Sequence, residues 1–333
     1  MMREFTWDDL AYISSGMDDK NCPRSSASLV IYRYMDGKPV LDLQRFLKKS
    51  EINMYLRGGC AVICADFSLS DKADFILCRS TYSSFFLKGW AYAHRGLHGD
   101  GIPENSMAAF KAALDAGYGI ELDIHLLKDG NLAVIHDSLL NRTTGQAGHI
   151  EDLTTQQLKD YTLEGTEETI PEFMDVLTLY NGKAPLIVEL KPYDGNQAAL
   201  TEAACKMLES YKGVYCLESF DPRCVAWLKK NRPELIRGQL TENFFKSRSD
   251  LPDYLKFALS HNLLNFLGRP DFVAYKFENR KDSFTTELCR KLWKCQGVTW
   301  TITSMEDYNT AVAEGWIPIF EGFEPGDKKK LEN

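Results

Sequence analysis

Histidines, carboxylates and basic side chains stand at the ends of several short apolar segments of this sequence. His94 and Arg95 follow one such segment and His136 follows another, while two further segments end in Glu121-Leu122-Asp123 and Glu189-Leu190-Lys191. In a barrel of parallel strands, the carboxyl ends of all the strands meet at one face. The sequence therefore predicts that these side chains gather at a single site.

Three acidic side chains of this group are candidate metal ligands. Glu121 and Asp123 share one face of their strand, because strand side chains alternate with a period of two, and Glu189 comes from another strand. Buried carboxylates must be paired or bound to a metal, and a set of oxygen ligands suits Mg²⁺ or Ca²⁺ better than Zn²⁺. Salt bridges to Arg95 and Lys191 are the alternative to metal binding.

Short motifs along the chain together resemble the glycerophosphodiester phosphodiesterase family, and most closely its bacterial branch. The resemblance runs from about Leu87 to the C-terminus. Its motifs occur in this order: His94-Arg95-Gly96, Pro103-Glu104-Asn105-Ser106, Glu121-Leu122-Asp123, Lys128-Asp129-Gly130, His136-Asp137, Arg142-Thr143-Thr144 and Glu189-Leu190-Lys191. The resemblance implies a hydrolase that releases an alcohol and glycerol 3-phosphate, with a divalent cation held by Glu121, Asp123 and Glu189.

The two histidines are candidates for a general acid and a general base. Cleavage of a phosphodiester needs a base for the attacking oxygen and an acid for the leaving alkoxide. The imidazoles of His94 and His136 have an ordinary pKa near neutrality and meet both needs. Arg95 and Lys191 offer positive charge to the non-bridging phosphate oxygens. Two routes remain open: attack by a neighbouring substrate hydroxyl through a cyclic phosphate, and direct attack by water.

Further residues are expected around the substrate. His98, in the loop after the first barrel strand, is a candidate for contact with the substrate. Phe220 and Trp300 are expected to pack in the core, and the alternative, which the resemblance implies, is that they line the pocket for the alcohol. Glu104 and Asn105 are expected to brace the loop that follows the first barrel strand. Asn105 is the expected N-cap of the next helix, since asparagine is favoured at that position.

The end of the barrel departs from the family pattern. Many family members end in an extra strand that leads to Thr-Asp-x-Pro. The corresponding stretch here, residues 319–325, reads Ile-Phe-Glu-Gly-Phe-Glu-Pro, in which Glu324 takes the acidic position. This departure leaves the catalytic residues intact, and it leaves open the composition of the rim of the site and hence the substrate preference.

Two other functions share part of this pattern. Phospholipases of the same superfamily, similar to sphingomyelinase D or to phosphatidylinositol-specific phospholipase C, use related barrels. The long segment after His136, which contains Arg142-Thr143-Thr144, favours the glycerophosphodiester reaction. A non-catalytic phosphoglycerol-binding protein is the alternative from another class, but binding alone would need no pair of histidines.

Apolar runs alternate with helical stretches from Leu87 onward, which predicts a TIM-type (β/α)8 barrel. Strands are expected at residues 91–93, 119–124, 132–135, 186–190, 214–217, 235–240, 271–277 and 298–302. Helices are expected at residues 107–116, 172–180, 197–211, 223–230, 251–259, 283–295 and 305–314.

The connections after the second and third expected strands break this alternation. Residues 125–131 are too few for a crossover helix, so this chain segment forms either a hairpin or an extended return. Residues 138–171 form a long polar segment with one short helix at 154–161. Because long loops in compact domains are usually functional or disordered, and because the resembled family carries an insertion here, a cap over the site is expected.

Residues 1–87 are predicted to form a small α+β extension, and residues 88–333 the barrel. A helix is expected at residues 7–13, a strand at 28–34, a second strand or a helix start at 39–46, and an apolar run at 60–67. The extension contains no catalytic cluster, so its role is left open.

Composition limits the class of partner and the compartment. The net charge of −8 argues against nucleic acid, since phosphate backbones attract basic surfaces. The number of cysteines, nine, is odd, and none forms a Cys-x-x-Cys pair. We therefore expect buried free thiols in a reducing compartment. No stretch reaches the roughly 18 apolar residues that span a bilayer, and the N-terminus lacks a signal-peptide pattern. We therefore expect a cytoplasmic protein with a small-molecule substrate; its oligomeric state is left open.

Overall fold

The chain forms two compact units, Met1–Phe85 and Phe86–Asn333. The computed structural model describes the backbone of residues 27–35, 38–47, 62–66 and 74–78, and residues 89–326 except 212, 233–234, 248–249 and 293–294. Among these residues, no helix is both long and apolar enough to cross a membrane.

The described part of the first unit is an antiparallel sheet with the strand order β2-β1-β3-β4. Its strands are β1 (Ala27–Met35), β2 (Lys38–Leu47), β3 (Val62–Asp66) and β4 (Asp74–Cys78). The predicted strand at 28–34 is thus confirmed, and residues 39–46 belong to a strand rather than a helix. The helix expected at residues 7–13 lies outside the described residues.

The second unit is built on a closed barrel, which confirms the predicted fold. Within the described residues, eight strands pair in parallel, and the pairings of β5 with β6 and with β13 close the ring. In chain order the barrel strands are β5 (Tyr92–His94), β6 (Gly119–Leu126), β8 (Leu186–Leu190), β9 (Tyr215–Ser219), β10 (Arg237–Thr241), β11 (Phe272–Lys276), β12 (Gln296–Ile302) and β13 (Trp316–Phe320).

One of the eight expected strands was wrongly assigned to the barrel. The apolar run at 132–135 forms β7 (Leu132–Val134), which pairs antiparallel with β6 and extends the sheet beyond the ring. The short connection allows a hairpin, one of the two expected alternatives, but no parallel return. The eighth barrel strand is instead β13, which was expected as an extra strand at the end of the barrel.

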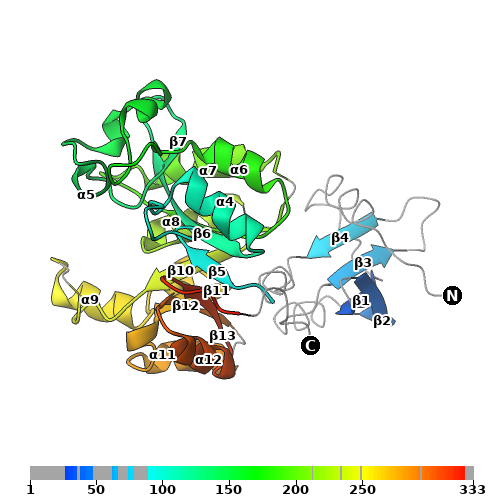
Figure 1. The fold of residues 1–333 in the computed structure, drawn as a ribbon. Helices are drawn as coiled ribbons and strands as arrows, with labels where there is room; N and C mark the ends of the chain where they lie inside the picture. Colours follow the sequence, from blue (N-terminus) through cyan, green and yellow to red (C-terminus); the bar gives the residue numbers. More distant parts are fainter. Residues whose placement is uncertain are drawn as a thin grey trace. The chain divides into compact units, whose positions relative to one another are not determined.

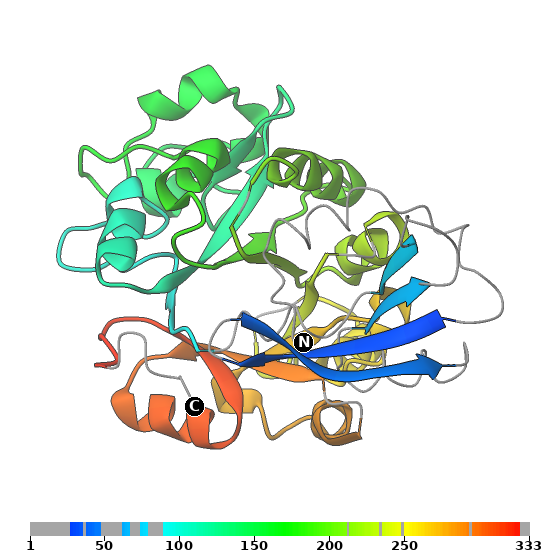
Figure 2. The ribbon, with the colours of Figure 1, turned by 90° about the vertical axis from the view of Figure 1, so that its right-hand side faces the viewer.

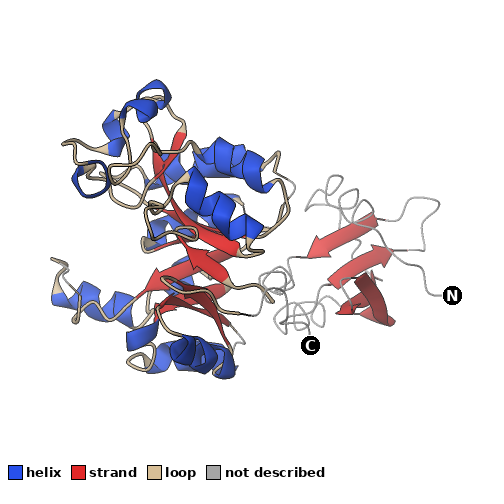
Figure 3. Cartoon of the chain, viewed as in Figure 1, coloured by secondary structure: helices blue, strands red, loops and turns tan. Residues whose placement is uncertain are grey.

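Helices follow the barrel strands and surround them (Figures 1 and 3). They are α4 (Met107–Asp115), α6 (Phe173–Tyr180), α7 (Gln197–Leu208), α8 (Pro222–Asn231), α9 (Asp253–Ser260), α10 (Asn265–Gly268), α11 (Phe284–Leu292) and α12 (Met305–Ala313), with a 3-10 turn, η3 (Phe277–Asn279). Polar caps start several of them: Ser106, Asp221 and Ser304 each accept a hydrogen bond from a backbone N–H of the first helical turn. The seven helices expected to alternate with the barrel strands are all present.

Alternation along the strands divides the apolar side chains between two layers. Tyr92 and Ile187 belong to a buried cluster inside the barrel, whereas Ala93 and Val188 belong to the larger cluster that includes side chains of the surrounding helices. Because strand side chains alternate, the inner face that carries Ile187 also carries Glu189. The apolar floor of the barrel and the polar site above it are therefore built from the same strand faces.

The segment after β7 is an insertion with its own small core. It contains α5 (Asn141–Thr144) and two 3-10 turns, η1 (Ile150–Asp152) and η2 (Thr155–Asp160), and in Figures 1 and 2 it projects beyond the barrel near β7. Side chains of the insertion such as Leu140 and Leu158 are buried with Ala133 of β7 in a separate apolar cluster. The hairpin β6–β7 thus anchors the insertion to the strand that carries Glu121 and Asp123.

The loop between β5 and α4 depends on Gly96. This residue has a φ of +84°, and a Cβ there would lie 2.8 Å from the carbonyl carbon and the Cβ of Ala109. The backbone N–H of the next residue, Leu97, donates to the carbonyl of Ala109. The loop that follows His94 and holds His98 is therefore packed closely against α4.

We predict that Gly96→Ala lowers the free energy of unfolding by about 2–5 kcal/mol, the combined cost of a left-handed alanine and of overpacking. Urea denaturation measures this change. Gly101→Ala is the matched control, since Gly101 has a φ of +88° and no atom lies within 4 Å of the place that a Cβ would occupy. It should cost only about 1–2 kcal/mol; equal losses in both variants would contradict the packing argument.

Candidate active site

Three carboxylates meet at the carboxyl ends of neighbouring barrel strands. Glu121 and Asp123 lie on β6 and Glu189 on β8, and one oxygen from each lies within 4.8 Å of the others. The outward residues between them, such as Leu122, pack into the cluster around the barrel, so alternation directs the three acids inward. Each has a relative exposure of at most 6%. The structure thus brings together the three residues that the sequence singled out.

Two basic side chains contact these acids. The Nζ of Lys191 lies 3.0 Å from Glu189 Oε1 and 3.2 Å from Asp123 Oδ1. Arg95 Nε lies 3.5 Å from Asp123 Oδ2, and its backbone N–H donates to Glu121 Oε2 at 3.3 Å. The salt bridges expected as an alternative to metal binding are therefore formed, and they hold both cations beside the three acids.

A fourth carboxylate, Glu218, was not identified from the sequence. It lies on β9, directly opposite Glu189 in the strand register, and has a relative exposure of 1%. Neither of its carboxylate oxygens has a hydrogen-bond partner among the described residues. Its position at a strand end, two residues after the inward-facing Cys216, is the same pattern that identified Glu189. We call Glu121, Asp123, Glu189 and Glu218 the acidic cluster.

Crowding of negative charge perturbs these carboxyl groups. Burial raises the pKa of Glu121 and Glu218 well above its ordinary value, and repulsion by the neighbouring acids adds to the shift. Burial also raises the pKa of Glu189 to about 7, although Lys191 opposes it. Burial would raise the pKa of Asp123 too, but Lys191 and the other nearby cations lower it well below its ordinary value.

The acidic cluster fits a divalent cation. It contains twice as many carboxylates as the two basic side chains, Arg95 and Lys191, that contact it. The remaining negative charge, together with the orphaned oxygens of Glu218, is what one hard divalent ion would neutralise. All the donors are carboxylate oxygens, which Mg²⁺ and Ca²⁺ prefer.

His94 ends β5 and faces the acidic cluster. Its Nε2 lies 3.8 Å from Glu121 Oε2, while its Nδ1 lies 2.5 Å from Glu321 Oε2. Burial lowers the pKa of His94, and the hydrogen bond to Glu321 opposes that shift. Glu321 was not identified from the sequence, although it directly follows an apolar run, the pattern that identified the other site residues.

His136 follows β7 and is held by the hairpin and the insertion. Its Nδ1 lies 2.7 Å from Asp137 Oδ1, and its backbone carbonyl contacts Nε2 of His125 at 3.1 Å. The other ring nitrogen of His125 contacts Glu151 of the insertion at 2.6 Å. Burial lowers the pKa of His136, and the charge of Asp123 acts against that shift. His136 therefore lies within the electrostatic reach of the acidic cluster.

The loop after His94 is braced differently from the expectation. Asn105 does not cap α4, because Ser106 does so. The buried Nδ2 of Asn105 instead donates to Asp123 Oδ2 at 2.9 Å. Glu104 bridges Arg95, at 2.9 Å, and Arg142 of the insertion, at 2.6 Å. The expectation that Glu104 braces this loop is consistent with these contacts, and Asn105 is an additional support for the acidic cluster.

The three expected pocket residues lie at two sides of this site. His98 lies in the β5–α4 loop, with its Nε2 at 3.7 Å from Glu321 Oε1. Phe220, after β9, and Trp300, on β12, form an edge-to-face pair with ring centroids 5.5 Å apart. The Nζ of Lys191 lies 6.0 Å from the centre of the Phe220 ring, so the aromatic pair borders the cationic side of the acidic cluster.

Sequence comparison relates this chain to a known protein family. A sequence model of the Glycerophosphoryl diester phosphodiesterase family matches residues 94–320. A glycerophosphodiester phosphodiesterase of Bacillus altitudinis is 45% identical over 161 residues, covering 45% of this chain and 65% of the relative. One of Caldanaerobacter subterraneus subsp. tengcongensis is 35% identical over 164 residues, covering 46% and 67%. The matched regions thus span about two thirds of these relatives.

A solved structure shares the fold. A phosphodiesterase of Oleispira antarctica, in complex with the product sn-glycerol-3-phosphate, superposes with a TM-score of 0.59 at 22% identity, covering 72% of this chain and 94% of that one. The family match spans more than half of the chain and includes both candidate histidines and all of the acidic cluster. This chain therefore belongs to the glycerophosphoryl diester phosphodiesterase family.

Proposed function

We propose that this chain hydrolyses glycerophosphodiesters to an alcohol and glycerol 3-phosphate, with a divalent cation and with His94 and His136 as the acid–base pair. The observation that carries the proposal is the meeting of two histidines with a buried, partly unneutralised acidic cluster at one end of a barrel. The names of the relatives, glycerophosphodiester phosphodiesterases, support the same substrate class.

The acidic cluster and its two cations would receive the phosphate. Glu121, Asp123 and Glu189 would hold Mg²⁺ or Ca²⁺, which when bound would stabilise the charge that grows on the phosphate oxygens in the transition state. Arg95 and Lys191 would contribute positive charge to the remaining oxygens. Their present ion pairs with the acids keep both side chains oriented toward that place.

The two histidines are suited to exchange protons with the substrate through Nε2. In each imidazole, Nδ1 is engaged by a carboxylate, Glu321 for His94 and Asp137 for His136. The Nε2 atoms remain for the attacking and the leaving oxygen. Burial lowers the pKa of both rings, which favours the neutral form that a general base requires. The histidine that acts as the acid must carry a proton on Nε2 as well.

Phe220 and Trp300 are proposed to line the alcohol side of the substrate. Their edge-to-face contact fixes both rings, and the indole Nε1–H of Trp300 donates to the carbonyl of Ala274 at 3.3 Å. Two rings fixed in this way offer an apolar wall beside Lys191, where the alcohol of a bound diester would lie.

The first prediction concerns the cation. Chelation should abolish turnover of a glycerophosphodiester, and Mg²⁺ or Ca²⁺ should restore it, because the acidic cluster then regains its counter-ion. The thermal unfolding midpoint should rise with metal concentration, since a ligand at about 100 times its Kd stabilises by about 2.7 kcal/mol.

Glu189→Gln should lose this metal-dependent thermal shift. Glu202→Gln, an exposed glutamate on α7, is the matched control and should keep it. Full turnover after exhaustive chelation, with no metal found by elemental analysis, would contradict the prediction.

The second prediction concerns the histidines. His94→Ala and His136→Ala should each reduce kcat by about 100-fold or more, the usual effect of losing a general acid or base. Thermal unfolding should show that both variants remain folded. A p-nitrophenyl ester needs little protonation of its leaving group, so it should rescue the variant that has lost the acid.

His261→Gln is the control for the loss of an imidazole, because His261 follows α9 and contacts Phe257 and Phe284 rather than the acidic cluster. It should retain the turnover of the unmodified chain. Near-normal turnover of glycerophosphodiesters by either folded alanine variant would show that the proposed pair is wrong.

A further inference from the structure

Glu321 stands beside His94 at the seam that closes the barrel. In the parallel pairing of β13 with β5, Phe320 is opposite Ala93. Glu321, which directly follows β13, and His94, the last residue of β5, therefore stand at corresponding positions. The backbone N–H of Glu321 donates to the carbonyl of Ile302 at 2.9 Å, which continues the contact with β12. The backbone of Glu321 is thus fixed by the barrel itself.

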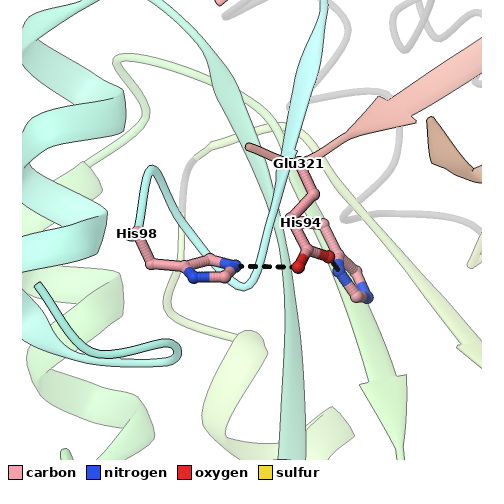
Figure 4. Close-up of side chains that lie close together, drawn as sticks. All are labelled: His94, His98 and Glu321. Atoms are coloured by element: carbon pink, nitrogen blue, oxygen red, sulfur yellow. Dashed lines mark hydrogen bonds and ion pairs between the residues drawn. The ribbon is translucent and has the colours of Figure 1, made fainter. Parts of the chain in front are cut away.

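The side chain of Glu321 lies between two histidines (Figure 4). Its Oε2 lies 2.5 Å from Nδ1 of His94, and its Oε1 lies 3.7 Å from Nε2 of His98. The two imidazoles come from β5 and from the loop after it, at the start of the barrel sequence. Glu321 follows β13, the last strand of the barrel sequence. One oxygen of the carboxylate is therefore hydrogen-bonded to His94, while the other faces His98 from beyond hydrogen-bond distance.

An ionised carboxylate can only accept hydrogen bonds. Nδ1 of His94 must then carry a proton to complete the short contact, which leaves the lone pair of the neutral ring on Nε2. That nitrogen lies on the side of Glu121, at 3.8 Å from its Oε2. The contact with Glu321 thus fixes both the tautomer of His94 and the direction of its reactive nitrogen.

We propose that Glu321 is a positioning residue for His94, which it holds in the Nδ1–H tautomer with Nε2 directed at the acidic cluster; this inference rests on the proposed function. Glu324, which took the acidic position in the sequence comparison, does not do this. It is exposed, and its Oε2 accepts from the hydroxyl of Tyr118 at 3.4 Å. The residue that reaches the site is the acid that directly follows the last strand.

The test uses Glu321→Gln in the full chain, with Glu324→Gln as the matched control. A carboxamide keeps the size of the side chain but no longer requires a proton on Nδ1, because its NH2 group can donate to that nitrogen instead. Glu321→Gln should reduce kcat by about 100-fold, the scale of a misplaced acid or base, with KM changed by less than about threefold. Glu324→Gln should leave both constants unchanged.

A double-mutant cycle separates positioning from general damage to the fold. The substrate is bis-p-nitrophenyl phosphate, chosen so that residual rates are measurable. If Glu321 acts through His94, adding Glu321→Gln to the His94→Ala variant should change its rate by no more than about twofold, since residues that act as a unit are not additive. A structural role would reduce the rate in both backgrounds.

A direct view of the tautomer completes the test. The chain contains six histidines, so ¹⁵N-histidine labelling gives few signals, and the His94 pair is assigned by its absence from His94→Ala. The expected pattern is a protonated Nδ1 and an unprotonated Nε2, lost in Glu321→Gln and kept in Glu324→Gln.

Three outcomes would overturn the inference. The first is turnover by Glu321→Gln within twofold of the unmodified chain. The second is an equal loss in both backgrounds of the cycle, and the third is a tautomer unchanged by Glu321→Gln. In each case an impaired His94→Ala variant would leave the proposed function standing. Normal turnover by His94→Ala would refute the role of His94 in the proposed function, and this inference with it.

Discussion

The mouth of this barrel buries more negative charge than its own basic side chains neutralise, and much of the local structure answers that constraint. Lys191 and Arg95 are paired with acids rather than extended into solvent, and the amide of Asn105 donates to Asp123. Unpaired buried carboxylates are costly, so the arrangement lowers the stability of the fold. The same excess charge would attract the divalent cation proposed above, so stability and the proposed function make opposite demands on these positions.

The inward face of a barrel strand carries both apolar packing and an acid of the cluster. On β8, Ile187 packs inside the barrel and Glu189 joins the acidic cluster two residues later. On β9, Cys216 and Glu218 repeat the arrangement. The apolar layer beneath fixes the strand register, and the register in turn fixes which acids are neighbours. A change in the packing of the floor would therefore displace the acids above it, even without contact with substrate.

Local patterns in the sequence were sufficient to predict most of the fold and the meeting of the three acids Glu121, Asp123 and Glu189. The acids of β6 and β8 were found because each follows from alternation within one short strand. The third expected strand, residues 132–135, was wrongly assigned to the ring, because β7 has the composition of a buried strand and nothing local shows that it pairs antiparallel. Glu321 was missed for a related reason: its partner, His94, is 227 residues away, and their contact exists only when β13 closes the ring.

The two histidines are oriented by carboxylates that depend on different parts of the fold. Asp137 is the sequence neighbour of His136, so that contact needs little more than the local conformation after β7. The contact of His94 with Glu321 needs the whole ring, since β13 must pair with β5 before the two side chains meet. Loosening of the β5–β13 seam would therefore release His94 from Glu321, while the local contact between His136 and Asp137 would persist. The proposed pairing of the two histidines thus depends on closure of the barrel.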